Sequence, residues 1–218
     1  MRLIHELRRE HELIDAVVGS LGTFVERRLQ GQAPAADGKR FLRFFRLFAG
    51  DFHHGREEDV LFAALVQQAE LPGDRGPIAN LQGDHHEMSR MLDDLAPLLA
   101  ADLDPPERAS RLSELAARYC RALWLHIDVE NSVLFPESEE RLRRIAILEL
   151  PSREMSGEER AAREDGEALR ETYPPRLDPL LIRGEECVIC PHYGESCDGI
   201  EREWWSDAEW EEFPDRVG

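Results

Sequence analysis

The sequence contains few cysteines and no long apolar run, and each shortage narrows the class of protein. No segment approaches the roughly 20 consecutive apolar residues that a membrane-spanning helix needs. The opening stretch, MRLIHELRREHELID, is charged and amphipathic and is followed by no apolar run of signal-peptide length. We therefore expect a cytoplasmic protein.

Basic residues are also scarce relative to acidic ones. The chain carries 27 lysines and arginines against 45 aspartates and glutamates, which gives a formal net charge of -18. This charge repels nucleic acids and anionic membrane surfaces, so neither is an expected partner.

With 42% hydrophobic residues, a chain of 218 residues can bury a well-formed core. We expect one main domain over residues 1–150 and an appended segment over residues 151–218.

Four stretches show the periodicity of amphipathic helices, with apolar residues three and four positions apart. They cover approximately residues 3–30, 39–70, 77–99 and 106–147. The breaks between them are rich in glycine and proline, as in GQAPAADG and LPGDRGP. Long helices joined by short loops pack antiparallel to their neighbours. The sequence therefore predicts an all-α fold, an antiparallel up-down-up-down four-helix bundle.

The segment after residue 150 has a weaker pattern. Ser156, with Glu159 three residues later, is typical of a capping box and predicts a short, charged fifth helix to about residue 172. From Tyr173 onward the chain is rich in proline, acidic residues and tryptophan, and it contains three of the four cysteines. We predict an irregular tail that packs on the bundle through Trp204, Trp205 and Trp210.

Each of the four predicted helices has a histidine within its apolar stripe, and two helices add a glutamate one turn later. Residues four positions apart point in the same direction, so each His/Glu pair presents two ligand atoms inward. Buried carboxylates without partners are costly, which favours a cation beside them. A single histidine of this kind is more often a hydrogen-bonded core residue, but four together with two repeated His/Glu pairs favour a two-metal site. The candidate metal ligands are His11, His53, Glu57, His85, His126 and Glu130.

The two halves of the predicted bundle resemble each other in sequence. HHGREEDVLFAAL at residues 53–65 aligns with HIDVENSVLFPES at residues 126–138, and EHELIDAVVGSL aligns with DHHEMSRMLDDL. Three other histidines lie off the stripes: His86 misses the stripe of His85 by about 100°, and His5 lies well off the direction of His11. His54 is excluded similarly, because Glu58, four residues later, faces away from the stripe. We expect these three histidines and Glu58 to point away from the site.

The ligand types restrict the metal. Histidine and carboxylate suit iron, manganese or zinc, and a carboxylate-bridged pair in a four-helix bundle most often holds iron or manganese. Six protein ligands for two ions leave open positions, where a small ligand such as dioxygen, peroxide or nitric oxide could bind.

Four segments carry a resemblance to a known family: EH at 10–11, HHGREEDVLF at 53–62, GPIANLQGDH at 76–85 and HIDVENSVLFP at 126–136. Together they resemble the haemerythrin-like family, also called the HHE cation-binding domain family, over about residues 1–148. The resemblance implies a non-haem di-iron centre, two iron ions with an oxo or hydroxo bridge, in which Glu57 and Glu130 bridge and the histidines bind terminally.

The sequence departs from the oxygen-carrying haemerythrins at two positions. Carriers have a second histidine one turn after the third-helix ligand, and an aspartate five residues after the fourth-helix histidine. This chain has Ser89 and Asn131 there. It is instead similar to bacterial members linked to nitric-oxide and oxidative stress, including those that repair iron–sulfur clusters.

The resemblance implies a protein that reacts with dioxygen, peroxide or nitric oxide, in stress protection or in iron–sulfur cluster repair. An oxidoreductase activity toward peroxide or nitric oxide is one form of this function. Two alternatives remain open, an iron donor or storage protein and a redox- or oxygen-sensing signalling module. The expected partners are these small ligands, with a protein partner or electron donor that the sequence does not identify.

The cysteines of the tail form a candidate second metal site. The segment Cys187-Val-Ile-Cys190-Pro-His192, followed by Cys197, supplies three thiolates and an imidazole, the ligand types of a Cys3His zinc site. A redox-active thiol group or an iron–sulfur cluster, and unligated cysteines, are the alternatives to one structural zinc ion. Cys120, in the fourth predicted helix, is expected to be a buried, inert thiol.

Overall fold

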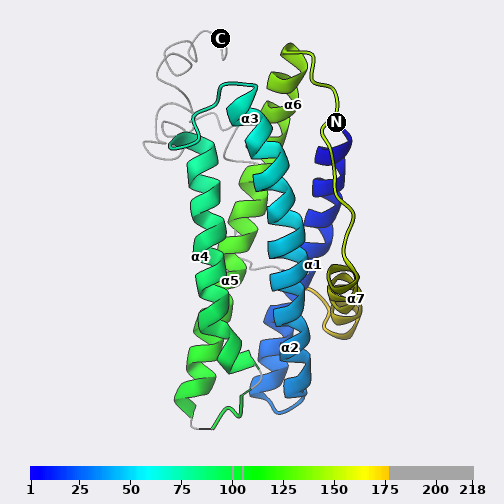
Figure 1. Cartoon of the computed structure of the whole chain (residues 1–218). Coiled ribbons are helices and arrows are strands. Elements are labelled where there is room, and N and C mark those ends of the chain that lie inside the picture. The colour runs from blue at the N-terminus through cyan, green and yellow to red at the C-terminus, as the bar shows by residue number, and fades with distance from the viewer. Residues whose placement is uncertain (100, 105, 177–218) are drawn as a thin grey trace.

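The computed structural model describes residues 1–99, 101–104 and 106–176, and all regular structure within these residues is helical. The helices of the described residues form long columns that stand side by side (Figure 1). The first is α1 (Arg2–Leu29), and the third is α4 (Gly76–Leu99). The second runs without a break through α2 (Ala35–Arg43), η1 (Phe44–His54), η2 (Glu57–Phe62) and α3 (Ala63–Gln67). The fourth comprises α5 (Pro106–Val129), η3 (Glu130–Leu134) and α6 (Phe135–Arg144). The all-α prediction is confirmed for the described residues.

The second and fourth columns contain π-helical segments, in which backbone N–H groups bond to carbonyl groups five residues earlier. Of these segments, η2 begins at Glu57 and η3 begins at Glu130, the two glutamates of the repeated sequence pattern. The backbone therefore repeats between the two halves of the chain as the sequence does. Inserted π-helical turns are frequent at functional sites, and these two coincide with candidate ligands.

The apolar core consists of two clusters with a polar layer between them. The smaller cluster includes Leu7 of α1 and Leu61 of η2, and the larger one includes Leu13 of α1 and Phe52 of η1. Along α1, His11 lies between Leu7 of the smaller cluster and Leu13 of the larger one. The candidate ligands of the other columns likewise fall between residues of the two clusters. The apolar side chains above and below thus keep bulk water away from the polar layer.

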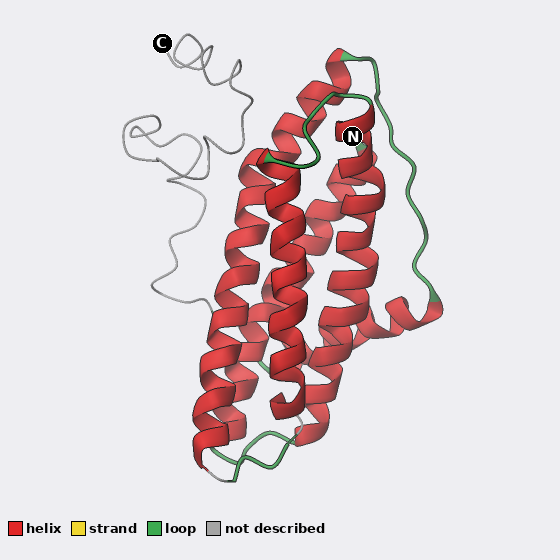
Figure 2. Cartoon of the chain, turned by 60° about the vertical axis from the view of Figure 1, so that its left-hand side comes forward, coloured by secondary structure: helices red, strands yellow, loops and turns green. Residues whose placement is uncertain are grey.

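A further helix, α7 (Gly157–Thr172), packs on the outside of the first two columns (Figure 2). Its predicted capping box is confirmed, because the Glu159 backbone N–H donates to Ser156 Oγ at 3.2 Å and the Ser156 N–H donates to the Glu159 carboxylate at 2.7 Å. Gly166 faces the Phe44 ring so closely that an added Cβ would lie 2.3 Å from a ring carbon. Only glycine permits this approach without a shift of the packing.

The anchoring of α7 to the second column is also electrostatic. Asp165 accepts hydrogen bonds from Arg40 at 2.8 Å and from Arg43 at 2.7 Å. At its end, the Tyr173 hydroxyl donates to Asp37 at 2.6 Å. The fifth helix is therefore tied to the column that carries η1.

The expectations for the cysteines and the tail have different outcomes. Cys120 is buried, its thiol donates to the Val18 carbonyl at 3.4 Å, and burial raises its pKa to about 12, so the prediction of a buried, unreactive thiol is confirmed. Two predictions concern residues outside the described part of the chain. One is the packing of Trp204, Trp205 and Trp210 on the bundle, and the other is the candidate metal site of Cys187, Cys190, His192 and Cys197. Within the described residues, no helix combines the length and apolarity that crossing a membrane requires.

Candidate metal centre

Seven side chains from the four columns converge in the polar layer and form two groups that could each hold a metal ion. Within each group the candidate ligand atoms lie within 4.8 Å of one another. The first group is His11, His53, Glu57 and Glu130, and the second is His54, Glu57, His85 and His126. The six residues singled out from the sequence are thus brought together, joined by His54. Glu57 belongs to both groups, so the two share a carboxylate.

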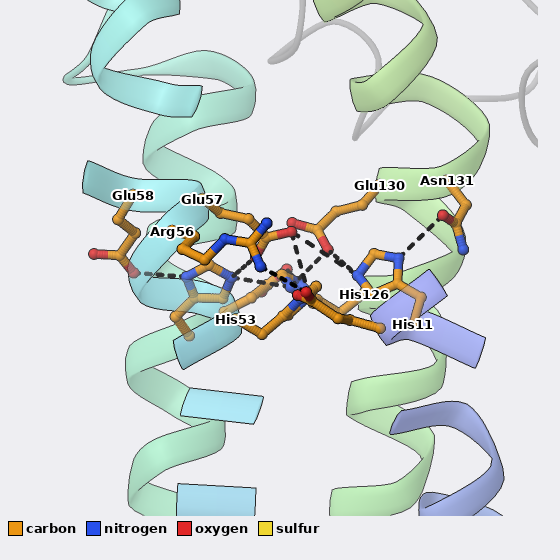
Figure 3. Close-up of polar contacts among 11 residues, drawn as sticks. His11, His53, Arg56, Glu57, Glu58, His126, Glu130 and Asn131 are labelled. Atoms are coloured by element: carbon orange, nitrogen blue, oxygen red, sulfur yellow. Dashed lines mark hydrogen bonds and ion pairs between the residues drawn. The ribbon is translucent and has the colours of Figure 1, made fainter. Parts of the chain in front are cut away.

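In the first group, the imidazole Nε2 atoms face the two carboxylates (Figure 3). His11 Nε2 lies 3.2 Å from Glu130 Oε2 and 3.9 Å from Glu57 Oε1. His53 Nε2 lies 3.4 Å from the same Glu57 oxygen, as the spacing of four residues predicts. Two nitrogens and two carboxylates therefore surround one point.

The second group has the same inward arrangement. His126 Nε2 lies 3.3 Å from Glu130 Oε2, and His85 Nε2 lies 3.7 Å from Glu57 Oε2. The Nε2 atoms of His85 and His126 are 3.0 Å apart. Two nitrogen ligands about 2.1 Å from one ion and at right angles to each other would be separated by about 3.0 Å, so this spacing fits a shared metal.

The outward Nδ1 atoms of four histidines each face an oxygen on another column. The pairs are His11 with Asn131 Oδ1 at 3.0 Å, His53 with Glu10 Oε2 at 2.9 Å, His85 with Glu58 Oε1 at 2.6 Å, and His126 with Asp84 Oδ2 at 3.5 Å. A ring that donates its Nδ1–H outward leaves the Nε2 lone pair directed into the site. This is how metal-binding histidines are usually oriented.

The outer contacts follow the internal repeat of the sequence. Glu10 directly precedes His11 and pairs with His53, and Asp84 directly precedes His85 and pairs with His126 in the same way. Glu58 directly follows Glu57 and pairs with His85, and Asn131 directly follows Glu130 and pairs with His11. His54 breaks the repeat, because it aligns with Ile127. The second group therefore has three histidines and the first group has two.

The expectation that His54 points away from the site is wrong. Its ring stacks on that of His85 with the centroids 3.9 Å apart, whereas His53 meets His11 edge to face at 4.6 Å. His53 turns toward α1 and belongs to the first group, and His54 turns toward α4 and belongs to the second. A single inward direction does not describe a column with two neighbours, and the wider π-helical turn brings adjacent side chains closer in direction.

Glu58 was also expected to face away, yet it contacts the outer nitrogen of His85. By contrast, the expectation for the two remaining histidines is confirmed. His5 and His86 are exposed, and neither belongs to a metal-binding group of the described residues.

Six of the inward ligand atoms are buried and have no hydrogen-bond partner. Glu57 and Glu130 are both 0% exposed, and neither oxygen of either carboxylate is satisfied. The Nε2 atoms of His11 and His53 are in the same state. A buried carboxylate without hydrogen bonds is strongly disfavoured in its ionised form. A cation among these atoms would supply the partner that the protein does not.

The protonation states agree with this requirement. Burial lowers the pKa of His53, His54 and His85, so their imidazoles are neutral at pH 7. Burial, together with the charge of Glu130, raises the pKa of Glu57 well above its usual value. Metal ligation needs neutral imidazole and ionised carboxylate. These three histidines are therefore ready to bind, and a nearby cation would hold Glu57 in its ionised form.

Arg56 is a component of the site that the sequence analysis missed. It is only 2% exposed, and its guanidinium donates to Glu10 at 2.6 Å and to Glu6 at 2.9 Å while lying 4.7 Å from the centre of the Phe52 ring. Glu10 in turn faces the outer nitrogen of His53. An arginine directly before a candidate ligand was the available signal. Arg56 thus holds His53 in place through Glu10.

Comparison with known proteins identifies the family. Residues 2–138 match the Hemerythrin HHE cation binding domain, so the chain belongs to this family. Two curated relatives, described only as uncharacterized proteins of Mycobacterium bovis and Mycobacterium tuberculosis, are each 30% identical to it over 136 residues. The aligned region is 60% of this chain and 51% of each relative, so the chain spans about half the length of the curated relatives it matches. No solved structure matches the chain.

Proposed function

We propose that the four columns form the antiparallel up-down-up-down bundle of this family and hold two iron ions in the polar layer. The observation that carries the proposal is the set of six buried ligand atoms without hydrogen-bond partners, on His11, His53, Glu57 and Glu130. These atoms lie close enough together to bind two metal ions. In the absence of a cation they would remain a large uncompensated cost within a well-packed core.

The ligands divide between the two ions. The first ion would take His11 and His53, and the second would take His54, His85 and His126. Both carboxylates would be shared, because Glu57 belongs to both groups, and Glu130 Oε2 contacts one histidine of each group at 3.2 and 3.3 Å. His54 supplies the third histidine of the second ion. In the oxygen carriers that histidine comes from the position that Ser89 occupies here.

The chemistry of the ligands suits iron. Imidazole and carboxylate together bind iron or manganese in helical bundles, and a pair of iron ions supplies redox reactivity toward dioxygen, peroxide or nitric oxide. The protein orients the histidines through their outer oxygens and excludes water with the two apolar clusters. We propose a role in oxidative or nitrosative stress protection or in iron–sulfur cluster repair.

Two observations support reaction and retention over carriage or storage. Asn131, which replaces the carboxylate of the carriers, places its Oδ1 3.0 Å from the outer nitrogen of His11. Six of the seven candidate ligands are buried, and four of the five histidines are held from outside by another side chain. Such a site favours ions that stay bound over ions that exchange freely.

The domain division remains part of the proposal. Residues 1–150 would form the metal-binding domain, and residues 151–218 would be an appended segment with a structural zinc site at its cysteines. The packing of α7 against η1 supports the view that the appended segment begins as a support for the second column.

The test is metal analysis of protein purified from iron-replete cells, combined with its optical spectrum. We expect close to two irons per chain assigned to the bundle and the charge-transfer absorption of a bridged ferric pair. The variants Glu57→Ala and Glu130→Ala should lose this absorption, whereas His86→Ala should keep it. A preparation with one zinc, no iron and no such absorption would refute the proposal.

A further inference from the structure

A groove of about 400 Å³ lies between α1 and α5, away from the candidate ligands. Its walls are mainly small or apolar side chains, and those that matter here are Val25 and Leu29 of α1 and Ala116, Ala117 and Trp124 of α5. Leu29 is 43% exposed, one of the few large apolar side chains that the described residues leave open to solvent. The groove is therefore an apolar surface that the described part of the chain does not cover.

Trp124 gives the groove an unmatched hydrogen-bond donor. Its side chain is only 5% exposed, and its buried indole N–H has no acceptor among the residues that the structure describes. A buried tryptophan N–H usually has a partner. The groove thus lacks both an apolar cover and one acceptor.

The chain that follows α7 leads to this groove. It crosses the outside of α1, where the Thr23 hydroxyl donates to the Pro174 carbonyl at 2.7 Å. The Arg176 backbone N–H then donates to the Gly19 carbonyl at 3.2 Å. The Arg176 side chain pairs with Glu26 and forms part of the groove wall. Residue 177 therefore starts at the edge of the groove.

Gly19 permits this crossing. An added Cβ at this position would lie 2.8 Å from the Arg176 carbonyl oxygen and 2.9 Å from its backbone nitrogen. Both are backbone atoms, so a larger residue would push the crossing chain away from α1. The sequence of α1 thus allows the chain to be held close to the helix just before it reaches the groove.

We propose that residues 177–182, with the sequence LDPLLI, dock in this groove in an extended conformation. Four of these six residues are leucine or isoleucine, which suits the apolar walls. Pro179 favours an extended backbone at the preceding residue, and an extended segment has carbonyl groups free to accept the Trp124 N–H. The proposal concerns the cover of the bundle and does not depend on which metal the centre binds.

Reach and charge favour this occupant over a second copy of the chain. Six extended residues span about 20 Å, whereas α1 rises only about 10 Å from Gly22 to Leu29. A short tether gives the segment an effective concentration on the order of millimolar at the groove. A second copy would have to approach against the repulsion of two chains that each carry a net charge of -18.

Two engineered thiols in the full-length chain report on the cover. Ala117→Cys places a thiol in the groove, and Arg118→Cys places one beside it, at a position that pairs with Glu87 of α4 and lines no part of the groove. Both positions are exposed when only the described residues are considered. Freshly reduced protein is treated with iodoacetamide, and mass spectrometry separates each engineered thiol from the native cysteines. We expect the thiol of Ala117→Cys to react at least tenfold more slowly than that of Arg118→Cys.

The occupant is identified by adding Leu180→Asp with Leu181→Asp to each reporter. This pair should accelerate the reaction of Ala117→Cys at least fivefold and leave Arg118→Cys within twofold. Val217→Asp, an apolar-to-aspartate change outside the segment, is the matched control and should alter neither rate.

Three results would overturn the proposal. Reaction of Ala117→Cys within twofold of Arg118→Cys would mean that the groove is open. Protection that the two leucine substitutions leave unchanged would mean that another part of the chain covers it. Protection that is lost on dilution of the protein would assign the groove to a second copy. Since none of these readouts uses the metal ions, failure here would leave the proposed function untouched.

Discussion

Replacing Arg56 by methionine removes the charged group that holds Glu10 against His53, at similar side-chain length. Removing one partner of a buried ion pair typically costs about 3 to 5 kcal/mol. Arg56 is 2% exposed, but its partners Glu10 and Glu6 are 15% and 27% exposed and can recover some hydration. We therefore expect a loss of about 3 kcal/mol in the free energy of unfolding, at the lower end of that range.

The same substitution should also weaken one metal ion. Loss of an outer partner of a metal-binding histidine lowers metal affinity about 10- to 100-fold. Arg56 acts through Glu10 on His53, which belongs to the first group only. A chelator titration of iron-loaded protein should therefore show one iron released at a lower chelator concentration, while the second follows the wild type more closely. For a chain of this size, thermal unfolding should shift down by about 6 to 12 °C.

Arg46→Met is the matched control, in the same helical column. Arg46 pairs at 2.6 Å with Asp93, but these side chains are 46% and 67% exposed, and surface ion pairs contribute at most about 1 kcal/mol. Combining Arg56→Met with Glu10→Gln tests the contact chain, because residues in one network have non-additive effects. If Arg56→Met matches Arg46→Met in both stability and iron release, Arg56 does not position His53.

Three further outcomes follow from the structure. His54→Ala should release one of its two metal ions at a lower chelator concentration than His86→Ala does, and identical release from the two variants would contradict the assignment of His54 as a ligand. Gly166→Val forces a side chain into the ring of Phe44, where the Cβ alone would lie 2.3 Å away, so urea unfolding should show a loss of about 1 to 3 kcal/mol. The pKa of Glu159 is lowered to about 2, chiefly by a hydrogen bond from a neighbouring arginine, from its usual value of 4.5. A carboxylate with a lowered folded-state pKa contributes its stability above its unfolded value, so the wild type's advantage over Glu159→Gln should be constant above about pH 5 and shrink between about pH 4.5 and pH 2. An advantage unchanged at pH 2.5 would contradict this account.

The sequence alone determined the features that depend on local periodicity. Helix limits followed from three-and-four spacing and from glycine and proline breaks, and the capping box at Ser156 was visible because its hydrogen bonds join residues three apart. The inward direction of His53 with Glu57 followed in the same way, since both lie on one helical turn. These inferences need no knowledge of the neighbouring columns.

Only the tertiary structure decided which partners lie across the columns. The sequence argument assumed one inward direction per helix, so it rejected His54, which turns toward α4 and stacks on His85 at 3.9 Å. The outer oxygens come from other columns, and the chain order does not reveal that Glu10 serves His53 and not its neighbour His11. Burial and charge pairing between distant segments are set by packing, because a helix's own period specifies a face but not what lies opposite that face.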